Sequence, residues 1–259
     1  MEKRRLSDIK QYEKGFFLVK FLKEVYLNDL LDGNLYMNNF QYFIDLEKET
    51  KEKGQGDKRE AGHVFRSTNI RLIDPETNQV IATGSVGEVI ERYIGVEKIP
   101  VFCMTIFRYS EFEIIEEKEE SVVVKLVLPP KDQKNYIETF GEKAVILPHY
   151  FLERLEEKNN EEPLGLAYAE VQYHDYDVIS SERRTLFDER SIQFFFWKDN
   201  FFSNQREFRI VLTQKLVDQP FKLNIGSVVD GAIVVDSEKL FEAEFEFPLN
   251  KELTEENNK

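Results

Sequence analysis

Short segments of strand length dominate the hydrophobic pattern of this chain. Residues 16–21 form a short apolar run, and His63–Ile73 alternates apolar and polar residues with the period of two that a half-buried strand requires. Residues 207–213 are a further strand of the same kind. The other predicted strands are residues 35–37, 100–107, 121–128, 169–179, 221–225, 232–235 and 241–247.

Helical spacing is confined to a few short stretches. Asn38 and Asn39 suit the N-cap of a helix whose apolar face contains Phe40, Phe43 and Leu46. Residues 85–88 fit a capping box, in which a Ser hydroxyl and a Glu carboxylate close the first helical turn, so a helix is predicted there too. The remaining helices are predicted at residues 27–31, 130–140 and 150–157.

The polar segments between these elements are predicted to be loops. Residues 48–60 combine glycines with charges and are expected to form a flexible surface loop, and residues 111–120 form the charged tip of a hairpin. Neither an internal repeat nor a linker divides the chain. We therefore expect one β-rich mixed α+β domain with several short helices over residues 1–250, followed by a flexible acidic tail at residues 251–259.

The charge balance limits the classes of partner. The chain has 49 acidic and 35 basic residues, which gives a net charge of −14. Such a surface repels nucleic-acid phosphates and anionic lipids, so neither partner is expected, although a local basic patch is still compatible with it. Residues 1–23 are basic and the end of the chain is acidic, and these segments either pair with each other or are separately solvated.

The sequence also argues against a nucleophilic cysteine, a metal site, two common catalytic motifs and a membrane span. Cys103 is the only cysteine and lies in an apolar run, which suits a small buried residue better than a nucleophile. His63, His149 and His174 lack the spacing of metal ligands, and the chain contains neither a P-loop nor a G-x-S-x-G motif. We therefore expect no metal. The polar N-terminus and the short apolar runs predict a cytoplasmic protein with no membrane partner.

One late segment combines aromatic and charged residues. Six aromatic residues, including the only Trp, occur within residues 194–202, just before the strand that carries Glu207 and Arg209. These two side chains are two positions apart and share one face of the strand. They either line a pocket, where Phe202, Arg209 and Trp197 contact a substrate, or form a surface ion pair above a packed core.

This segment resembles part of the mono-ADP-ribosyltransferases. Gln205-Arg206-Glu207, followed by a strand, is similar to the Gln/Glu-x-Glu turn and strand of that family. The resemblance implies that Glu207 holds the nicotinamide ribose of NAD and stabilises an oxocarbenium-like transition state. It also implies that Gln205 orients the acceptor and that Phe202 recognises substrate.

A second part of the chain is similar to the same family. Residues 65–69 resemble its aromatic-x-Ser-Thr-Ser strand, which implies that Ser67 supports the catalytic site. Asn69 stands where the family has its last Ser, and the separation between Ser67 and Gln205 is longer than in the family.

The order of several motifs also resembles uncharacterised bacterial and prophage-encoded hypothetical proteins. The similar pieces are residues 33–37, Gly56-Asp57 with Glu60, residues 100–103, Lys198 with Phe202 and residues 205–209, and Ile225-Gly226. This resemblance implies no particular activity. It implies a role in phage–host conflict, in which small proteins often act by binding a partner protein.

The sequence therefore supports two functional hypotheses. The first is an acidic interaction or regulatory protein that binds a host or phage protein. It is expected to need no cofactor, and a homo-oligomer is a further option. The second is a mono-ADP-ribosyltransferase-like enzyme that uses NAD, with Glu207, Gln205 and Ser67 in its catalytic site.

Overall fold

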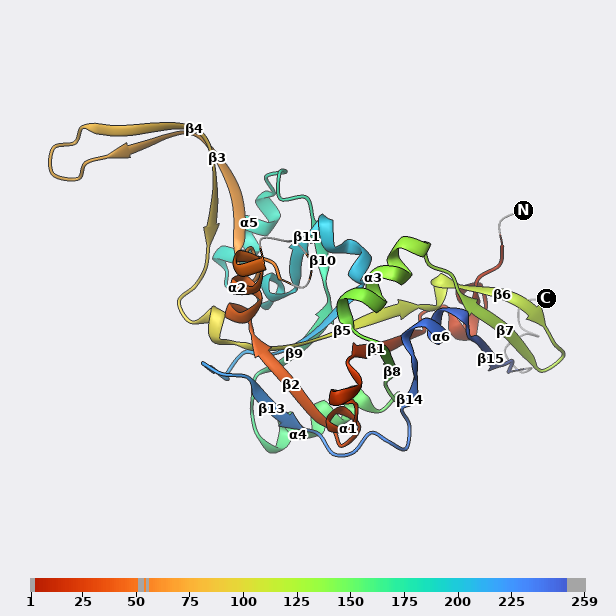
Figure 1. The fold of residues 1–259 in the computed structure, drawn as a ribbon. Helices are drawn as coiled ribbons and strands as arrows, with labels where there is room; N and C mark the ends of the chain where they lie inside the picture. Colours follow the sequence, from red (N-terminus) through yellow and green to blue (C-terminus); the bar gives the residue numbers. More distant parts are fainter. Residues whose placement is uncertain (1–2, 51–53, 55, 251–259) are drawn as a thin grey trace.

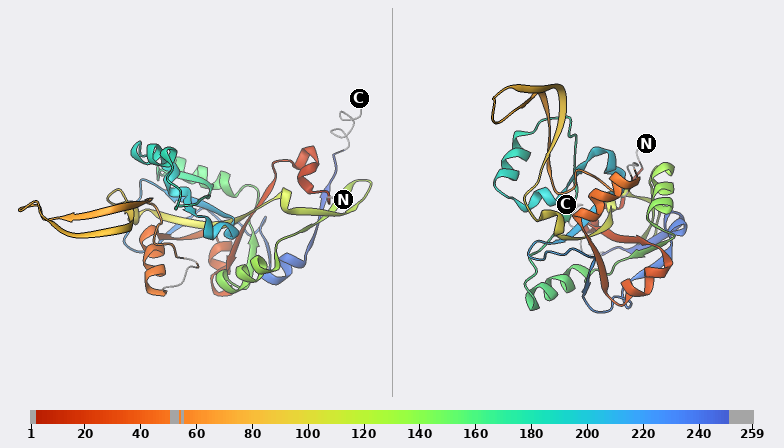
Figure 2. Two further views of the ribbon diagram at one scale, coloured as in Figure 1. Left: turned by 90° about the horizontal axis from the view of Figure 1, so that it is seen from above. Right: turned by 60° about the vertical axis from the view of Figure 1, so that its left-hand side comes forward.

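The computed structural model describes residues 3–50, 54 and 56–250, and it has a mixed α+β fold with several sheets, as expected (Figures 1 and 2). The largest sheet runs in the order β13–β2–β5–β1–β8–β14, and β12 joins it through β5 and in turn pairs with β9. Its strands are β1 (Phe16–Leu22), β2 (Asn34–Asn39), β5 (Pro100–Arg108), β8 (Lys143–Ile146), β9 (Leu166–Glu170), β12 (Glu207–Leu212), β13 (Phe221–Asn224) and β14 (Ile233–Asp236).

Strand β5 is the branch point of this sheet. β12 pairs with β5 along residues 101–105, so β1 and β2 must share its other edge. β1 pairs with residues 105–108 and β2 with residues 100–101. The edge of β5 at residues 102–104 therefore has no strand partner within the described part of the chain, and β1 diverges from β5 at this point to pair with β8.

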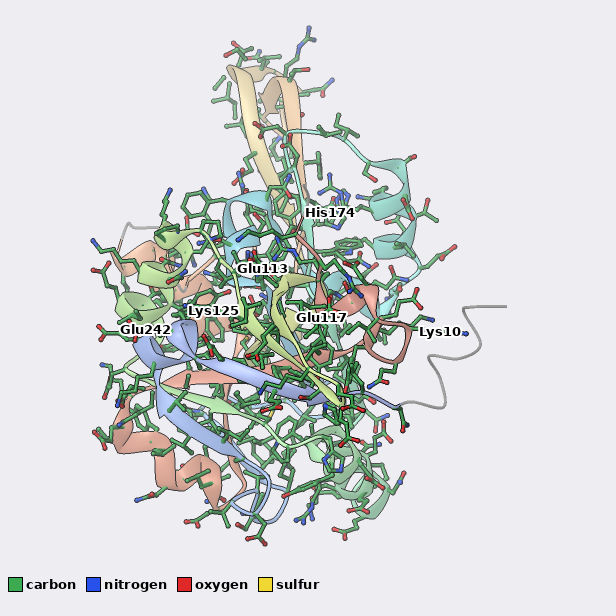
Figure 3. The ribbon with its side chains drawn as sticks, turned by 90° about the vertical axis from the view of Figure 1, so that its right-hand side faces the viewer. Lys10, Glu113, Glu117, Lys125, His174 and Glu242 are labelled. Carbon is green, nitrogen blue, oxygen red and sulfur yellow. The ribbon has the colours of Figure 1, made fainter. Side chains whose placement is uncertain are left out.

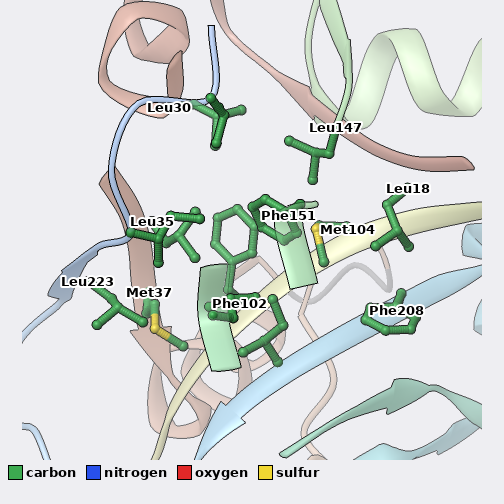
Figure 4. Close-up of a cluster of buried hydrophobic side chains, with 14 of the residues drawn as sticks. Leu18, Leu30, Leu35, Met37, Phe102, Met104, Leu147, Phe151, Phe208 and Leu223 are labelled. Atoms are coloured by element: carbon green, nitrogen blue, oxygen red, sulfur yellow. The ribbon is translucent and has the colours of Figure 1, made fainter. Parts of the chain in front are cut away.

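The alternation of side chains buries both faces of the large sheet. Leu18 and Met104 belong to a core cluster on one face, part of which is shown in Figure 4, and Val19 and Ile146 belong to a cluster on the other face. Helices α1 (Leu27–Leu31) and α4 (Phe151–Glu161) supply residues to the first cluster. Helices α3 (Pro130–Phe140) and α6 (Ser237–Glu242) supply residues to the second.

Three smaller sheets flank the large one. A three-stranded sheet contains β6 (Phe112–Glu117), β7 (Ser121–Leu126) and β15 (Glu244–Pro248), and a short parallel pair contains β10 (Gln172–His174) and β11 (Trp197–Asp199). β3 (His63–Ile73) and β4 (Val80–Glu91) form a long hairpin that projects from the end of the molecule opposite to the three-stranded sheet (Figures 1 and 2). We call this hairpin the arm. Helices α2 (Phe40–Thr50) and α5 (Ser181–Asp188) lie near its base.

The helix predicted from the capping box at residues 85–88 is wrong. These residues lie in β4, where Gly87 pairs with Ser67 and Glu88 pairs with Arg66 in the ladder of the arm. A Ser-x-x-Glu pattern stabilises a first helical turn only locally, whereas the ladder with β3 satisfies the backbone along the whole strand. The long-range pairing therefore decides the structure.

Other elements differ from the prediction mainly in their limits. The acidic residues 111–120 were expected at a hairpin tip, but most of them form β6, and the hairpin connects β6 to β7. Residues 169–179 contain the end of β9 and all of β10 rather than one strand, and residues 241–247 begin within α6. Helix α4 continues four residues past its predicted end at residue 157. The predicted tail at residues 251–259 lies outside the described residues.

The basic N-terminal segment pairs with the three-stranded sheet. Lys3 Nζ lies 2.5 Å from Glu113 Oε1, and Arg4 forms an ion pair with Glu117. Figure 3 looks onto this end of the molecule, where both glutamates are labelled. Among the helices within residues 3–50 and 56–250, none is long and apolar enough to cross a membrane.

Candidate functional site

A pocket opens where β1 diverges from β5. Its volume is about 740 Å³, and it is enclosed by the end of β1, by α1, β2 and α2, and by residues 101–105 of β5. This volume falls within the range of roughly 300–1,000 Å³ that is typical of small-molecule sites. Eight of the residues that line it are aromatic, namely Phe21, Tyr26, Tyr36, Phe40, Tyr42, Phe43, Phe102 and Phe140.

A network of buried charges forms one wall of the pocket. Glu207 accepts hydrogen bonds from Arg209 Nε at 2.5 Å and from Lys198 Nζ at 2.8 Å. Arg209 Nη2 also donates to Glu60 Oε1 at 2.6 Å, and Lys198 Nζ lies 3.6 Å from the same oxygen. The four residues are only 1–5% exposed. A buried charge is tolerated only when it is paired and hydrogen-bonded, and this network meets that condition.

The pairing fixes the protonation of these side chains. Burial by itself would raise the pKa of Glu207, but the Arg209 and Lys198 cations outweigh it and hold that pKa well below its usual range. Burial would lower the pKa values of Lys198 and Arg209, and the carboxylate of Glu207, followed by that of Glu60, raises both instead. All three groups are therefore charged at neutral pH, and Glu207 is held by two cations.

Asp57 and Glu60 form the less satisfied part of the network. Asp57 is 2% exposed, and burial, together with the negative charge of Glu60, raises its pKa to about 7. Asp57 Oδ1 accepts a hydrogen bond from the Arg59 backbone, but Asp57 Oδ2 and Glu60 Oε2 are buried without a hydrogen-bond partner. A buried acceptor without a donor costs about 1–3 kcal/mol, so these two oxygens are the least favourable part of the network; Glu60 lines the pocket and Asp57 does not.

The turn before β12 is held in place by Gln205 and Arg206. Lys198 Nζ donates to Gln205 Oε1 at 2.9 Å, and Gln205 Nε2 donates to the Gly54 carbonyl at 2.8 Å. Arg206 adopts a left-handed backbone conformation with φ of 46°, and its guanidinium pairs with Glu111 and Asp132. These contacts position Glu207 at the first residue of the strand.

Lys20 lines the pocket between strands and, unlike Lys198 and Arg209, forms no ion pair with a carboxylate of the described residues. Its Nζ donates to the Cys103 carbonyl at 2.5 Å, on the open edge of β5, and lies 4.4 Å from the centroid of the Phe102 ring. Burial lowers the pKa of Lys20, although Cys103 and Glu207 oppose that shift. No carboxylate of the described residues lies within 4.0 Å of its ammonium nitrogen.

The structure brings three of the six residues that the sequence singled out into the lining of the pocket. Glu207, Gln205 and Arg209 line the pocket. Phe202 does not line it but packs against Lys198, with 4.7 Å between the ammonium nitrogen and the ring centroid. The shared face of Glu207 and Arg209 is confirmed by the direct hydrogen bond that Arg209 Nε donates to Glu207 Oε1.

Two candidate residues lie elsewhere. Ser67 is on β3 in the arm, opposite Gly87, and does not line the pocket with Glu207. Trp197 is buried in a separate core cluster, where its ring packs edge-to-face against His174. The thiol of Cys103 has a pKa that burial raises, which suits a small buried residue.

Sequence reasoning missed Lys20, Asp57 and Glu60 as site residues. Lys20 interrupts an apolar strand, and a lone charge in such a run is a signal for a buried functional group. Asp57 and Glu60 belong to the segment that was expected to be a flexible surface loop, and only the fold reveals their burial. Within residues 3–50, 54 and 56–250, no group of three or more His, Cys, Asp or Glu side chains is arranged to hold a metal ion.

Comparisons with protein-family models, with curated proteins and with solved structures find no match to this chain. The pocket and its charged wall are therefore the basis for a functional proposal.

Proposed function

We propose that this protein binds a small molecule that has a flat ring, of the nucleoside class, in the 740 Å³ pocket. The observation that supports the proposal is the combination of aromatic walls with a buried network of Glu60, Lys198, Glu207 and Arg209 at one side. Aromatic side chains stack on the faces of bases, and a rigid polar wall selects hydrogen-bonding groups. The same cavity thus offers both a surface on which a ring can stack and fixed polar groups that can orient it.

The state of Glu60 narrows the class of ligand. Glu60 lines the pocket, its Oε1 is used by Arg209, and its Oε2 has no partner. A ligand that donates a hydrogen bond, such as a ribose hydroxyl or an amide N–H, would satisfy this oxygen once the Glu60 carboxylate turns it from its buried position toward the cavity. A purely apolar ligand would leave it unpaired.

Calorimetric titration with the four common ribonucleosides, their 5′-monophosphates and NAD tests this proposal. Tyr36 lines the pocket and is 51% exposed, so Tyr36→Ala should leave the fold intact while removing a stacking surface. We expect this variant to bind about tenfold more weakly, since stacking on one aromatic ring contributes about 1–3 kcal/mol.

Phe201→Ala is the matched control, because Phe201 is also an exposed aromatic residue, at 57%, but does not line the pocket. Its affinity should equal that of the wild-type protein. Absence of binding by every compound at millimolar concentration would rule out the proposed function.

A transferase activity is a second candidate, favoured by the presence of both Glu207 and Gln205 in the pocket lining. We propose it in a limited form, since Ser67 lies in the arm and the two cations bound to Glu207 reduce the negative charge it can offer to an oxocarbenium ion. Incubation with NAD should release nicotinamide and label a protein if this candidate is correct. NAD that remains intact, in the presence of host lysate, would eliminate it.

The interaction hypothesis has support of its own from the arm. Four exposed apolar residues lie near its tip, namely Leu72, Ile73, Val80 and Ile81. We propose that this protein is a regulator in phage–host conflict and that it contacts a host or phage protein through the tip of the arm. Ligand binding in the pocket would then regulate this contact. Ile81→Asp should then abolish the capture of that partner, whereas the control Ile179→Asp, at an exposed site outside the arm, should not.

A further inference from the structure

The gap in the large sheet is the place where Lys20 lines the pocket. β1 and β2 leave residues 102–104 of β5 without a strand partner on one edge, and Lys20 reaches this edge through its bond to the Cys103 carbonyl. An ammonium group has three N–H donors, and this bond uses one of them. Lys20 therefore has donor capacity left for a ligand in the pocket.

The other buried cations of the pocket are already committed. Lys198 and Arg209 each contact both Glu207 and Glu60, so their charges are balanced within the wall. An additional anion on the ligand would find less attraction there than at Lys20, which has no such partner among the described residues.

The charge of the whole lining points in the same direction. Four basic residues line the pocket, namely Lys20, Lys23, Lys198 and Arg209, against three acidic ones, namely Asp29, Glu60 and Glu207. Asp29 is further neutralised by Lys222, which lies outside the lining, at 2.8 Å. A pocket with a small basic excess, in a protein of net charge −14, favours an anionic group on its ligand.

We infer that Lys20 binds a phosphate group, so that the ligand is a nucleoside phosphate rather than a free nucleoside. This inference rests on the proposed function. In this arrangement the aromatic walls contact the base, Glu60 Oε2 accepts a hydrogen bond from a ligand hydroxyl or amide, and Lys20 with its neighbour Lys23 neutralises the phosphate. Lys20 is thereby a specificity-determining residue.

The test compares paired ligands on matched variants. Wild-type protein, Lys20→Met, Lys20→Arg and the control Lys118→Met are titrated with the four ribonucleoside 5′-monophosphates and the four matching nucleosides; Lys118 is a partly exposed lysine that pairs with Glu246, and neither of these two residues lines the pocket. We expect the wild-type protein and the control to prefer at least one monophosphate over its nucleoside about tenfold or more, since the phosphate adds a charge-assisted hydrogen bond. Lys20→Met should reduce that preference to about twofold without changing the affinity for the nucleoside, and Lys20→Arg should retain part of it.

The outcomes separate the inference from the function on which it rests. Equal affinity of the wild-type protein for monophosphates and nucleosides would overturn the inference and leave the binding function intact. The same holds if Lys20→Met weakens both kinds of ligand equally while its thermal melt is unchanged. Failure of every compound to bind the wild-type protein would overturn the proposed function and the inference together.

Discussion

Two buried carboxyl groups, Glu207 and Asp57, have pKa values shifted in opposite directions from their ordinary values. Glu207 contacts two cations, and its pKa is lowered. Asp57 is buried next to the negative Glu60, and its pKa is raised to about 7. Burial therefore favours the charged form of Glu207, which contacts two cations, and the neutral form of Asp57, which lies near another carboxylate.

Asp57 predicts a decrease in stability as the pH rises. Its pKa in the folded state, about 7, exceeds the ordinary value of 3.8, so the folded protein binds more protons than the unfolded one between these values. Stability from Asp57 is thus fully present below about pH 4 and is lost as the pH rises through 7. His63 and His174, whose pKa values burial lowers, act in the opposite sense below about pH 6.5.

Comparison with Asp57→Asn isolates the contribution of Asp57. The Asn side chain is neutral at every pH and can keep the bond from the Arg59 backbone. We expect the free energy of unfolding of this variant to rise relative to wild type by about 2–3 kcal/mol between pH 5 and pH 8. Urea denaturation at several pH values measures the difference, and a constant difference would show that Asp57 does not titrate in this range.

The ion network predicts a large cost for removing one of its charges. Glu207→Gln leaves Lys198 and Arg209 with an uncompensated buried charge, so we expect a loss of about 3–5 kcal/mol of stability. Glu170→Gln breaks an ion pair with Arg108 in which both side chains are at least 37% exposed, and it should cost less than about 1 kcal/mol. Similar effects of the two substitutions on the denaturation midpoint would contradict the burial of the network.

At the scale of elements, the sequence predicts structures that local interactions can stabilise by themselves. The N-cap at Asn39 is confirmed, because its side-chain oxygen accepts a hydrogen bond from the Tyr42 backbone. The strand with Glu207 and Arg209 on one face is confirmed as well. Residues 85–88 were misassigned because their partner, Ser67 and its neighbours, contacts them only through the hairpin ladder. Asp57 and Glu60 escaped prediction for a related reason, since residues far along the chain bury them.

The tight turn at Gly33, just before β2, is expected to tolerate no side chain. Gly33 has a φ of +83°, and a Cβ atom there would lie 1.9 Å from the Gly226 carbonyl oxygen. Gly95 has a similar φ of +90°, but its Cβ would meet nothing closer than 3.9 Å. Both Ala substitutions have a backbone cost of about 1–2 kcal/mol, and we expect Gly33→Ala to lose clearly more stability because of the additional clash. Equal melting temperatures for the two variants would contradict this close approach.

At the scale of the whole molecule, β1, β5 and β8 connect the core clusters on both faces of the sheet. Alternate residues of each strand belong to different clusters, so neither face can lose its packing without exposing the other. The arm is the exception, since β3 and β4 pair only with each other. The body is therefore expected to unfold in one step, independently of the distal arm.

Shortening the arm tests that independence. Replacement of residues 69–85 by Asn-Gly would join Thr68 to Val86, which already pair, through a two-residue hairpin turn. We expect the free energy of unfolding to change by less than about 1 kcal/mol, and nucleotide affinity to be unchanged. A larger loss in urea denaturation would show that the tip of the arm supports the body.

The branch at β5 also has a consequence for the synthesis of the protein. Thr105 pairs with Val19 on one side and with Glu207 on the other, so the central strand is incomplete until the last quarter of the chain has been made. At translation rates of roughly 5–20 residues per second, this interval lasts on the order of ten seconds. During this time the nascent chain exposes the edge of an apolar strand, and Lys20 lacks the completed wall of its pocket. The assembly of the binding site is thus expected to wait until β12 has been made, and a ribosome-associated chaperone would be an advantage during this interval.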